Sequence, residues 1–262
     1  MERLLGFAIN DTSHLEKVVM DHRQIFGVAR GLSDGGWGLG VHHHGEMLVQ
    51  KRRISAATNS AAEVIRAGAR HSVLHAAPRQ AGLFDLEQVQ PHRYRNWLFA
   101  SVGGYALPSQ FVAETSRMLQ GFTAEGRWMS CPNEGVMLLF MHALHSVGEL
   151  DRVRAHTRTL RRAMIAGTAA LTTLLGGTSQ VDLAIALHVR GYVYALSLGR
   201  PVSIRSLYPT GDSQGSLGRA GRHVRAVAVT NDAAADWGEV MPAWSMVEIG
   251  PGAQTELIAL QP

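Results

Sequence analysis

Short apolar segments punctuated by glycine recur along the chain, and this pattern predicts β-strands. The first covers residues 3–9 (RLLGFAI) and is too short for the hydrophobic segment of a signal peptide or for a membrane span, so we expect a buried strand there. Residues 36–52 alternate on both sides of His44-Gly45 and predict a hairpin that turns at that point. Further strands are predicted over residues 71–77, 96–104, 181–189, 191–198, 223–231 and 244–252.

Longer segments with apolar residues at helical spacing predict helices. They cover residues 11–27, 60–70, 108–122, 133–148 and 149–177. The middle of the chain is therefore helical and strands crowd both ends, which favours an α+β fold with antiparallel sheets over an alternating parallel α/β arrangement. No internal repeat and no Pro- or Ser-rich linker divides the sequence, so we expect a single domain over residues 1–262.

Composition narrows the class of protein. The 262 residues are 46% hydrophobic and 18% charged, which is the balance of an ordinary globular chain without a disordered tail. Cys131 is the only cysteine, so no disulfide can form within the chain. Because the sequence also lacks the pattern of a signal peptide or a membrane span, we expect a cytoplasmic protein that does not cross a membrane.

The charge balance is basic, with a formal net charge of +4, yet Lys17 and Lys51 are the only lysines. Such an arginine bias reflects codon composition more often than phosphate binding, and we do not expect nucleic acid as a partner. One predicted helix carries arginines at i, i+4, i+7 and i+8, which form a single stripe. This stripe is either a solvated face or a docking surface for an anion or a protein partner, and it consists of Arg154, Arg158, Arg161 and Arg162.

Candidate metal and nucleophile motifs have simpler explanations. On a strand, His42 and His44 point to one face and His43 to the other, with no carboxylate or cysteine at ligand spacing, so we expect exposed hairpin histidines and no metal site. Cys131 has no evident histidine partner in the sequence, which favours a buried thiol over a nucleophile. The glycine groups match no Walker or dinucleotide loop, and we expect no cofactor.

An ordered series of motifs runs through almost the whole chain. It comprises RLLGF at the start, DGGWGLG at 34–40, NWLFASVGG at 96–104, SCPNEG at 130–135 and TND at 230–232. The series resembles the class II glutamine amidotransferases, a branch of the N-terminal nucleophile hydrolases, especially the small bacterial proteins of the ergothioneine-pathway hydrolase type. The stretch DGGWGLG is similar to the family's DGWG-x-G with one extra glycine. The resemblance implies a four-layer αββα sandwich of two antiparallel sheets, with the nucleophile at the start of the first strand.

The nucleophile that this resemblance implies is absent. Members of the family use an N-terminal cysteine whose own α-amine activates its thiol, and the corresponding position holds Glu2. A carboxylate is a far weaker nucleophile toward an amide than a thiolate is, and the bulky side chain is expected to block removal of Met1. We therefore expect the covalent amidotransferase reaction to be lost.

Other positions that the resemblance assigns to the pocket are also replaced. The family's carboxylate-binding arginine aligns with Ala77, although Arg79 follows two residues on. The family's H-N-G, which forms the oxyanion hole, reads Ser101-Val102-Gly103 and leaves only the glycine N–H as a donor. The family's D-S-E, whose aspartate holds the substrate amine, reads Pro132-Asn133-Glu134. The vestigial pocket predicted in this way comprises Glu2, Arg3, His75, Ala77, Arg79, Ser101, Val102, Gly103, Pro132 and Glu134.

Two functions of different classes follow from these replacements. The first is a pseudoenzyme that acts as a binding, regulatory or assembly subunit for a protein partner, or as a homo-oligomer, with Glu2 in an ion pair to Arg3 or Arg79. The second is a redirected amidohydrolase, in which Glu2, near His75 and Ser101, activates water on a γ-glutamyl or other amide while the glycine N–H stabilises the oxyanion. The second function requires a raised Glu2 pKa.

Overall fold

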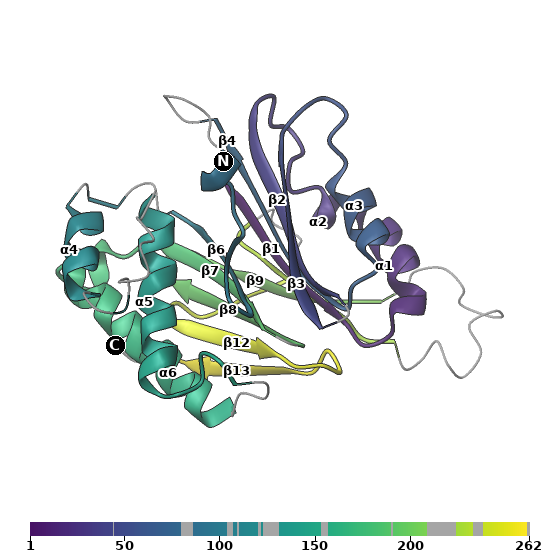
Figure 1. Cartoon of the computed structure of the whole chain (residues 1–262). Coiled ribbons are helices and arrows are strands. Elements are labelled where there is room, and N and C mark those ends of the chain that lie inside the picture. The colour runs from purple at the N-terminus through teal and green to yellow at the C-terminus, as the bar shows by residue number, and fades with distance from the viewer. Residues whose placement is uncertain are drawn as a thin grey trace.

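Two antiparallel β-sheets lie face to face at the centre of the protein, and helices cover the outer face of each (Figure 1). The computed structural model describes residues 1–43, 45–79, 86–103, 107–108, 110–119, 122, 131–152, 157–189, 191–208, 224–232 and 238–260. His44 and Arg154, two residues named from the sequence, lie outside these ranges.

Sheet A contains the N-terminal strand and has the order β11-β9-β10-β1-β4-β2-β3. Its strands are β1 (Arg3–Ile9), β2 (Gly35–His43), β3 (Glu46–Arg53), β4 (His71–Pro78), β9 (Ser203–Leu207), β10 (Ala226–Thr230) and β11 (Glu239–Val240). Strand β1 is buried from Leu4 onward, and Leu5 lies opposite Thr230 on one side and Leu74 on the other. The predicted N-terminal core strand and the predicted hairpin of β2 and β3 are therefore confirmed.

Sheet B has the order β13-β12-β8-β7-β6-β5. Its strands are β5 (His92–Tyr94), β6 (Trp97–Val102), β7 (Leu183–Val189), β8 (Tyr192–Leu198), β12 (Ser245–Ile249) and β13 (Thr255–Ala259). Strands β6 and β7 are buried along their whole length, which explains why their sequences are continuously apolar rather than alternating.

The helices form two outer layers. Sheet A is covered by α1 (Leu15–Asp21), α2 (Arg23–Phe26) and α3 (Ser60–Ala67), and sheet B by α4 (Phe111–Met118), α5 (Pro132–Ser146) and α6 (Thr157–Leu174) (Figure 1). Short 3-10 turns are η1 (Thr12–His14), η2 (Leu86–Gln88) and η4 (Thr178–Gln180). One hydrophobic cluster fills the space between the two sheets, and two others lie between each sheet and its helices. This is the predicted four-layer αββα sandwich.

Two predicted helices differ from the structure. Residues 11–27 divide into η1, α1 and α2 because the chain turns at His22, whose imidazole Nε2 lies 2.9 Å from the Tyr208 carbonyl oxygen. The helix predicted over 149–177 is α6, which begins only at Thr157. Gly148, with φ of +73°, lies in the left-handed region just after α5 and separates the two helices.

Four strands were not predicted, namely β5, β9, β11 and β13. All four lie at a sheet edge or next to one. In β13 only Ile258 is half-buried and the other residues are exposed, so the sequence carries little apolar periodicity. Strands of this kind give a weak sequence signal because they pair with few neighbours and bury few side chains, so their sequences need little apolar periodicity.

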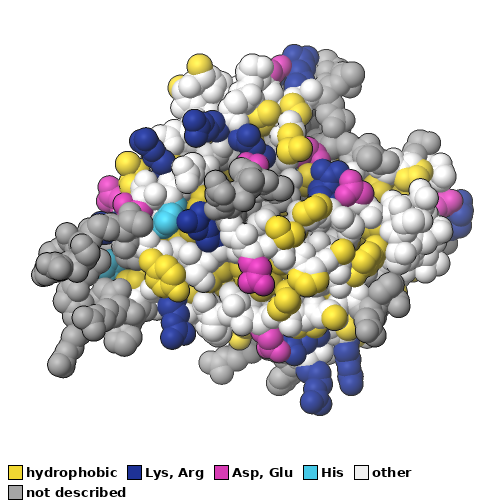
Figure 2. Space-filling view, turned by 180° about the vertical axis from the view of Figure 1, so that it is seen from behind, with side chains coloured by type: hydrophobic (Ala, Val, Ile, Leu, Met, Phe, Trp, Pro, Cys, Tyr) yellow, Lys and Arg dark blue, Asp and Glu magenta, His cyan; other side chains and the backbone are white. Residues whose placement is uncertain are grey.

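The described helices include none that is both long and apolar enough to cross a membrane. On the face shown in Figure 2, basic, acidic and hydrophobic side chains of the described residues are interspersed, and they do not gather into a patch of one charge.

Candidate functional site

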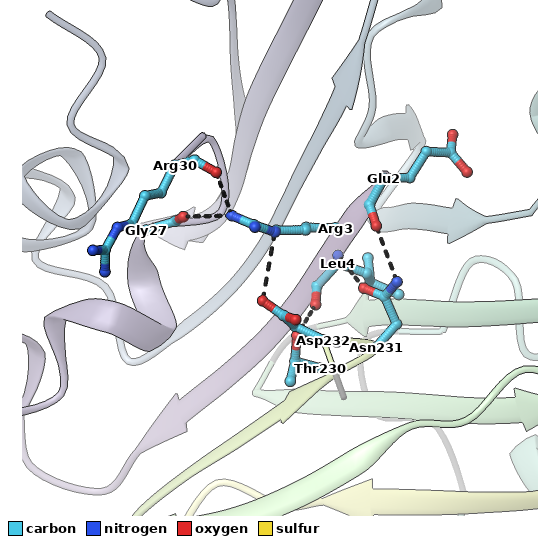
Figure 3. Close-up of polar contacts among 8 residues, drawn as sticks. All are labelled: Glu2, Arg3, Leu4, Gly27, Arg30, Thr230, Asn231 and Asp232. Carbon is cyan, nitrogen blue, oxygen red and sulfur yellow. Dashed lines mark hydrogen bonds and ion pairs between the residues drawn. The ribbon is translucent and has the colours of Figure 1, made fainter. Parts of the chain in front are cut away.

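The start of β1 is held in place by the residues that follow β10 (Figure 3). Asn231 accepts a hydrogen bond from Leu4 N through its Oδ1 at 2.6 Å, and its Nδ2 donates to the main-chain oxygen of Glu2 at 3.1 Å. Thr230 Oγ1 donates to the Leu4 carbonyl oxygen at 2.6 Å. The polar side chains of the TND motif therefore fix position 2 at the end of sheet A.

The side chains of Glu2 and Arg3 leave the strand in opposite directions, as alternation along a strand requires (Figure 3). Arg3 Nη1 donates to the carbonyl oxygens of Arg30 at 2.6 Å and Gly27 at 3.4 Å. Its Nε lies 3.4 Å from Asp232 Oδ2. The guanidinium is thus directed to the residues after α2, and its ionic partner is Asp232 instead of Glu2.

The Glu2 side chain reaches the end of β6 in sheet B. Its Oε2 accepts a hydrogen bond of 2.8 Å from the N–H of Gly103. Burial raises the pKa of Glu2 above its ordinary value, although the Gly103 N–H, the charge of Arg200 and the N-terminal amino group partly oppose this rise. Within the described residues, its other oxygen, Oε1, is buried without a hydrogen-bond partner. The largely buried carboxyl group of Glu2 therefore accepts a hydrogen bond from the Gly103 N–H, the one oxyanion-hole donor that the resemblance leaves in place.

Backbone geometry explains why a glycine stands at position 103. Gly103 has φ of +98°, and a Cβ atom there would lie 2.1 Å from the carbonyl oxygen of Asp182. The Asp182 carboxylate in turn binds Arg200, with Oδ2 2.5 Å from Nη2. Any larger residue would have to move this turn and, with it, the N–H that contacts Glu2.

His75 and Ser101 lie close together, but in a separate buried network that is centred on Gln90. The Gln90 side chain accepts from Ser101 N at 2.7 Å and donates to Ser101 O at 2.9 Å, and its Nε2 lies 3.4 Å from His75 Nε2. Ser101 Oγ donates to Asn133 Oδ1 at 2.8 Å. Burial lowers the pKa of His75 to about 3, so its imidazole is neutral near pH 7. No hydrogen bond between described residues joins this network to the Glu2 carboxylate.

The remaining predicted pocket positions are structural or peripheral. Val102 is fully buried in the cluster between the sheets, and Ala77 is buried opposite Gly36. Pro132 is the first residue of α5, and Glu134 lies in the first turn of the same helix. Arg79 is exposed and pairs with Asp34 at 3.5 Å instead of with Glu2. The ion pair between Glu2 and Arg3 or Arg79 that we considered from the sequence is therefore not formed.

Sequence reasoning missed two residues of this region. Asn133 stands at the place of the serine in the family's D-S-E, and this position in the SCPNEG motif was the only signal for it. Gln90 follows a stretch without any motif, and nothing in the sequence reveals that its side chain bonds to both His75 and Ser101. The contacts of Gln90 depend on the packing of one sheet against the other, which single-sequence patterns do not encode.

The structure places the histidines and the cysteine in more detail than the sequence could. His43 is exposed as expected. His42 was also expected to be exposed but is half-buried, and its ring lies 6.3 Å from that of buried His188, centroid to centroid. Cys131 is buried as expected, with Sγ 3.9 Å from Nε2 of His92, a neighbour that the sequence did not indicate. Among the described residues, no three His, Cys, Asp or Glu side chains form a group that could hold a metal ion.

The predicted arginine stripe is only partly a free surface. Arg161 folds onto sheet B, where it forms an ion pair with Glu256 and lies 3.9 Å from Glu248. Arg158 and Arg162 are exposed on α6. Burial raises the pKa of Glu248, and Arg161 opposes this rise.

No protein-family model and no curated protein sequence matches the chain. Solved structures do match it. A glutamine aminotransferase class-II domain protein from Silicibacter pomeroyi has a TM-score of 0.55 at 15% identity, with 99% of this chain and 100% of that chain covered. A predicted glutamine amidotransferase from Pseudomonas aeruginosa has a TM-score of 0.55 at 13% identity, with 98% and 99% covered. The chain has the class II glutamine amidotransferase fold.

The amidotransferase fold also occurs as a part of larger enzymes. Glutamine phosphoribosylpyrophosphate amidotransferase from B. subtilis, complexed with ADP and GMP, has a TM-score of 0.55 at 13% identity. The match covers 99% of this chain but 49% of that one, so this chain spans about half the length of that enzyme. At these identities the likeness shows the fold, and function must be argued from the residues of this chain.

Proposed function

We propose that this protein is a catalytically inactive relative of the class II glutamine amidotransferases that acts in the cytoplasm as a binding, regulatory or assembly subunit for a protein partner. The observation that carries the proposal is the 2.8 Å hydrogen bond from Gly103 N to the Glu2 carboxylate. An oxyanion hole works by presenting free donors to the oxygen that becomes charged in the transition state. Here a side chain of the protein itself occupies the donor, from the position where a nucleophile would be needed.

The neighbouring positions support the same conclusion. Val102 stands where the resemblance implies an oxyanion-hole amide, and it is packed in the core between the sheets. Ala77 and Pro132 stand where it implies a carboxylate-binding arginine and an amine-binding aspartate, and neither has a charged side chain. A glutamine substrate would therefore bring a carboxylate and an ammonium group to positions without a charged partner, at a high desolvation cost.

The outer face of α6 is our candidate for the partner surface. Arg158, Arg162 and Ile165 lie at i, i+4 and i+7 on this helix, and all three are exposed. Ile165 is 39% exposed, so an apolar side chain lies beside two arginines on one stripe. Exposed apolar side chains next to arginines are a common composition of protein interfaces.

Charge reversal on this stripe is expected to release the partner. We expect the tagged protein to recover one stoichiometric partner, or a second copy of itself, from its native cytoplasm. We expect the double variant Arg158→Glu, Arg162→Glu to recover about tenfold less because like charges then face the partner. Quantitative mass spectrometry of the recovered complexes measures this, with exposed Arg117→Glu on α4 as the matched control. A stoichiometric partner bound equally by both variants would exclude this surface.

One observation favours a second candidate, the redirected hydrolase. Burial raises the pKa of Glu2, as a general base tuned toward neutral pH requires. In this reaction Glu2 takes a proton from water, the resulting hydroxide attacks the amide carbon, and the released amine leaves with the proton. The Gly103 N–H must first leave Glu2 before it can stabilise the oxyanion, which is why we place this candidate second.

A further inference from the structure

A pocket lies outside sheet A, away from the Glu2 carboxylate, and the function proposed above does not use it. Its volume is about 610 Å³, and its walls are α2 with the residues after it and the segment from Ser55 to Ala61, including the start of α3. Figure 1 shows α2 and α3 beside each other on the outer face of sheet A. The volume is within the range of small-molecule sites.

The pocket is positively charged. Arg23 and Arg30 both line it, and none of the described residues that line it is acidic. Both arginines are exposed, and neither guanidinium has an ion-pair partner among the described residues. The carboxylate of Glu63, in the first turn of α3, is already bound by Arg52 at 3.5 Å and Arg66 at 2.6 Å.

The opposite wall supplies neutral donors. Ser55 and Thr58 contribute hydroxyl groups to the lining, whereas the hydroxyl proton of Ser60 is already donated to the Phe26 carbonyl oxygen. The N–H groups of Ser60 and Ala61 belong to the first turn of α3 and have no acceptor inside the helix, whereas the N–H of Ala62 is capped by Asn59 Oδ1 at 3.1 Å. The guanidinium groups of Arg23 and Arg30 on one side, with hydroxyl and N–H donors on the other, suit the binding of an oxyanion between them.

Hydrogen bonds fix both walls, so the pocket does not have to form when a ligand binds. Ser60 Oγ donates to the Phe26 carbonyl oxygen at 2.5 Å and ties the start of α3 to the end of α2. Arg3, reaching through from β1, donates to the carbonyl oxygens of Gly27 and Arg30 and fixes the main chain that carries the Arg30 side chain (Figure 3). A site held in this way loses little conformational entropy on binding.

We propose that this pocket binds the phosphate group of a small phosphorylated metabolite. Phosphate has more acceptor oxygens than a carboxylate, and the pocket offers more donors than a two-oxygen carboxylate can use. The volume exceeds that of a bare phosphate ion, and the lining residues Ala29, Leu32 and Ala56 provide apolar surface for the rest of the molecule. The proposal does not depend on whether Glu2 is catalytic.

Calorimetric titration of the full-length protein with inorganic phosphate at constant ionic strength tests this proposal. We expect saturable binding, weakened at least about tenfold in Arg23→Ala, Arg30→Ala, because each guanidinium donates charge-assisted hydrogen bonds to the anion. The control, Arg117→Ala, removes an exposed arginine from α4, outside the pocket, and is expected to bind like the wild type. Circular dichroism checks that all variants fold. Absence of saturable binding, equal binding by the pocket variant, or binding of succinate as tight as that of phosphate would overturn the proposal.

Discussion

Acidification below about pH 6.5 is expected to destabilise this protein progressively, because three histidines are buried as neutral bases. His71, His75 and His188 are at most 4% exposed. Burial lowers the pKa of His71 to about 4 and that of His75 to about 3, and it lowers the pKa of His188 well below its ordinary value. In the unfolded chain each would titrate near 6.5.

The sign of the effect follows from proton binding. Between about pH 4 and 6.5 the unfolded chain binds more protons at these histidines than the folded protein does, so stability rises with pH and is lost as pH falls. Each proton contributes about 1.4 kcal/mol per pH unit. Glu2 and Glu248, whose pKa values are raised by burial, act in the opposite direction and offset part of this. A net uptake of one to three protons corresponds to roughly 1.4–4 kcal/mol per pH unit, against a typical total stability of about 5–15 kcal/mol.

Urea denaturation between pH 7.5 and 5 measures this slope. His188→Leu is the informative variant, because neither ring nitrogen of His188 has a hydrogen-bond partner among the described residues and its removal orphans no other group. We expect the slope to fall by about one proton in this variant. The matched control is His43→Gln, which replaces an exposed histidine and is expected to leave the slope unchanged. Equal slopes in the wild type and His188→Leu would contradict the assignment.

Gly38→Ala is expected to destabilise the protein by about 3 kcal/mol, because the new Cβ has no space. It would lie 2.2 Å from the carbonyl oxygen of Gln90, a backbone atom that no side-chain rotation can move away. Strand β2 lies inside sheet A, where Gly38 pairs with His75 on β4 and Lys51 on β3. The clash would also displace the Gln90 side chain from Ser101.

Thermal and urea unfolding measure the loss, and about 3 kcal/mol corresponds to a fall in Tm of roughly 6–12 °C for a chain of this size. Gly27→Ala is the control, since the nearest atom to its added Cβ is 3.5 Å away and its φ of −79° suits any residue. We expect that variant to unfold within about 1 kcal/mol of the wild type. A Gly38→Ala protein of wild-type stability would show that the close approach of Gln90 is not required.

Gly38 also illustrates how far the sequence could predict the fold. The stretch DGGWGLG stood out as the most specific motif, and the structure gives its physical reason. A Cβ atom at Gly38 would meet the Gln90 carbonyl oxygen at 2.2 Å, and one at Gly40 would meet the Leu98 and Pro91 side chains at 2.7 and 2.8 Å. The buried strands of both sheets were predicted because their short apolar segments are punctuated by glycine or alternate with polar residues. The strands β5, β9, β11 and β13, at a sheet edge or next to one, were missed because they bury too little apolar surface to impose a period.

The candidate site was predicted less completely, for a different reason. From the sequence, Glu2 was identified as the replacement of the family's nucleophile and Gly103 as the retained glycine of its oxyanion hole. Their hydrogen bond, however, joins residues 101 positions apart and depends on the distance between two sheets. His75 and Ser101 were expected near Glu2, whereas Gln90 binds them in a network of their own. Pairings across layers follow from packing, which the pattern of a single sequence does not specify.

The most direct test of the central claim is the release of ammonia from glutamine, and of the amine from a γ-glutamyl amide, by the purified protein and by Glu2→Ala. Circular dichroism of both proteins confirms that the comparison is made between folded chains. If the site is inactive, the wild type releases product no faster than Glu2→Ala, and both match the rate in buffer. Turnover by the wild type that Glu2→Ala abolishes would contradict the pseudoenzyme account and establish Glu2 as a catalytic residue.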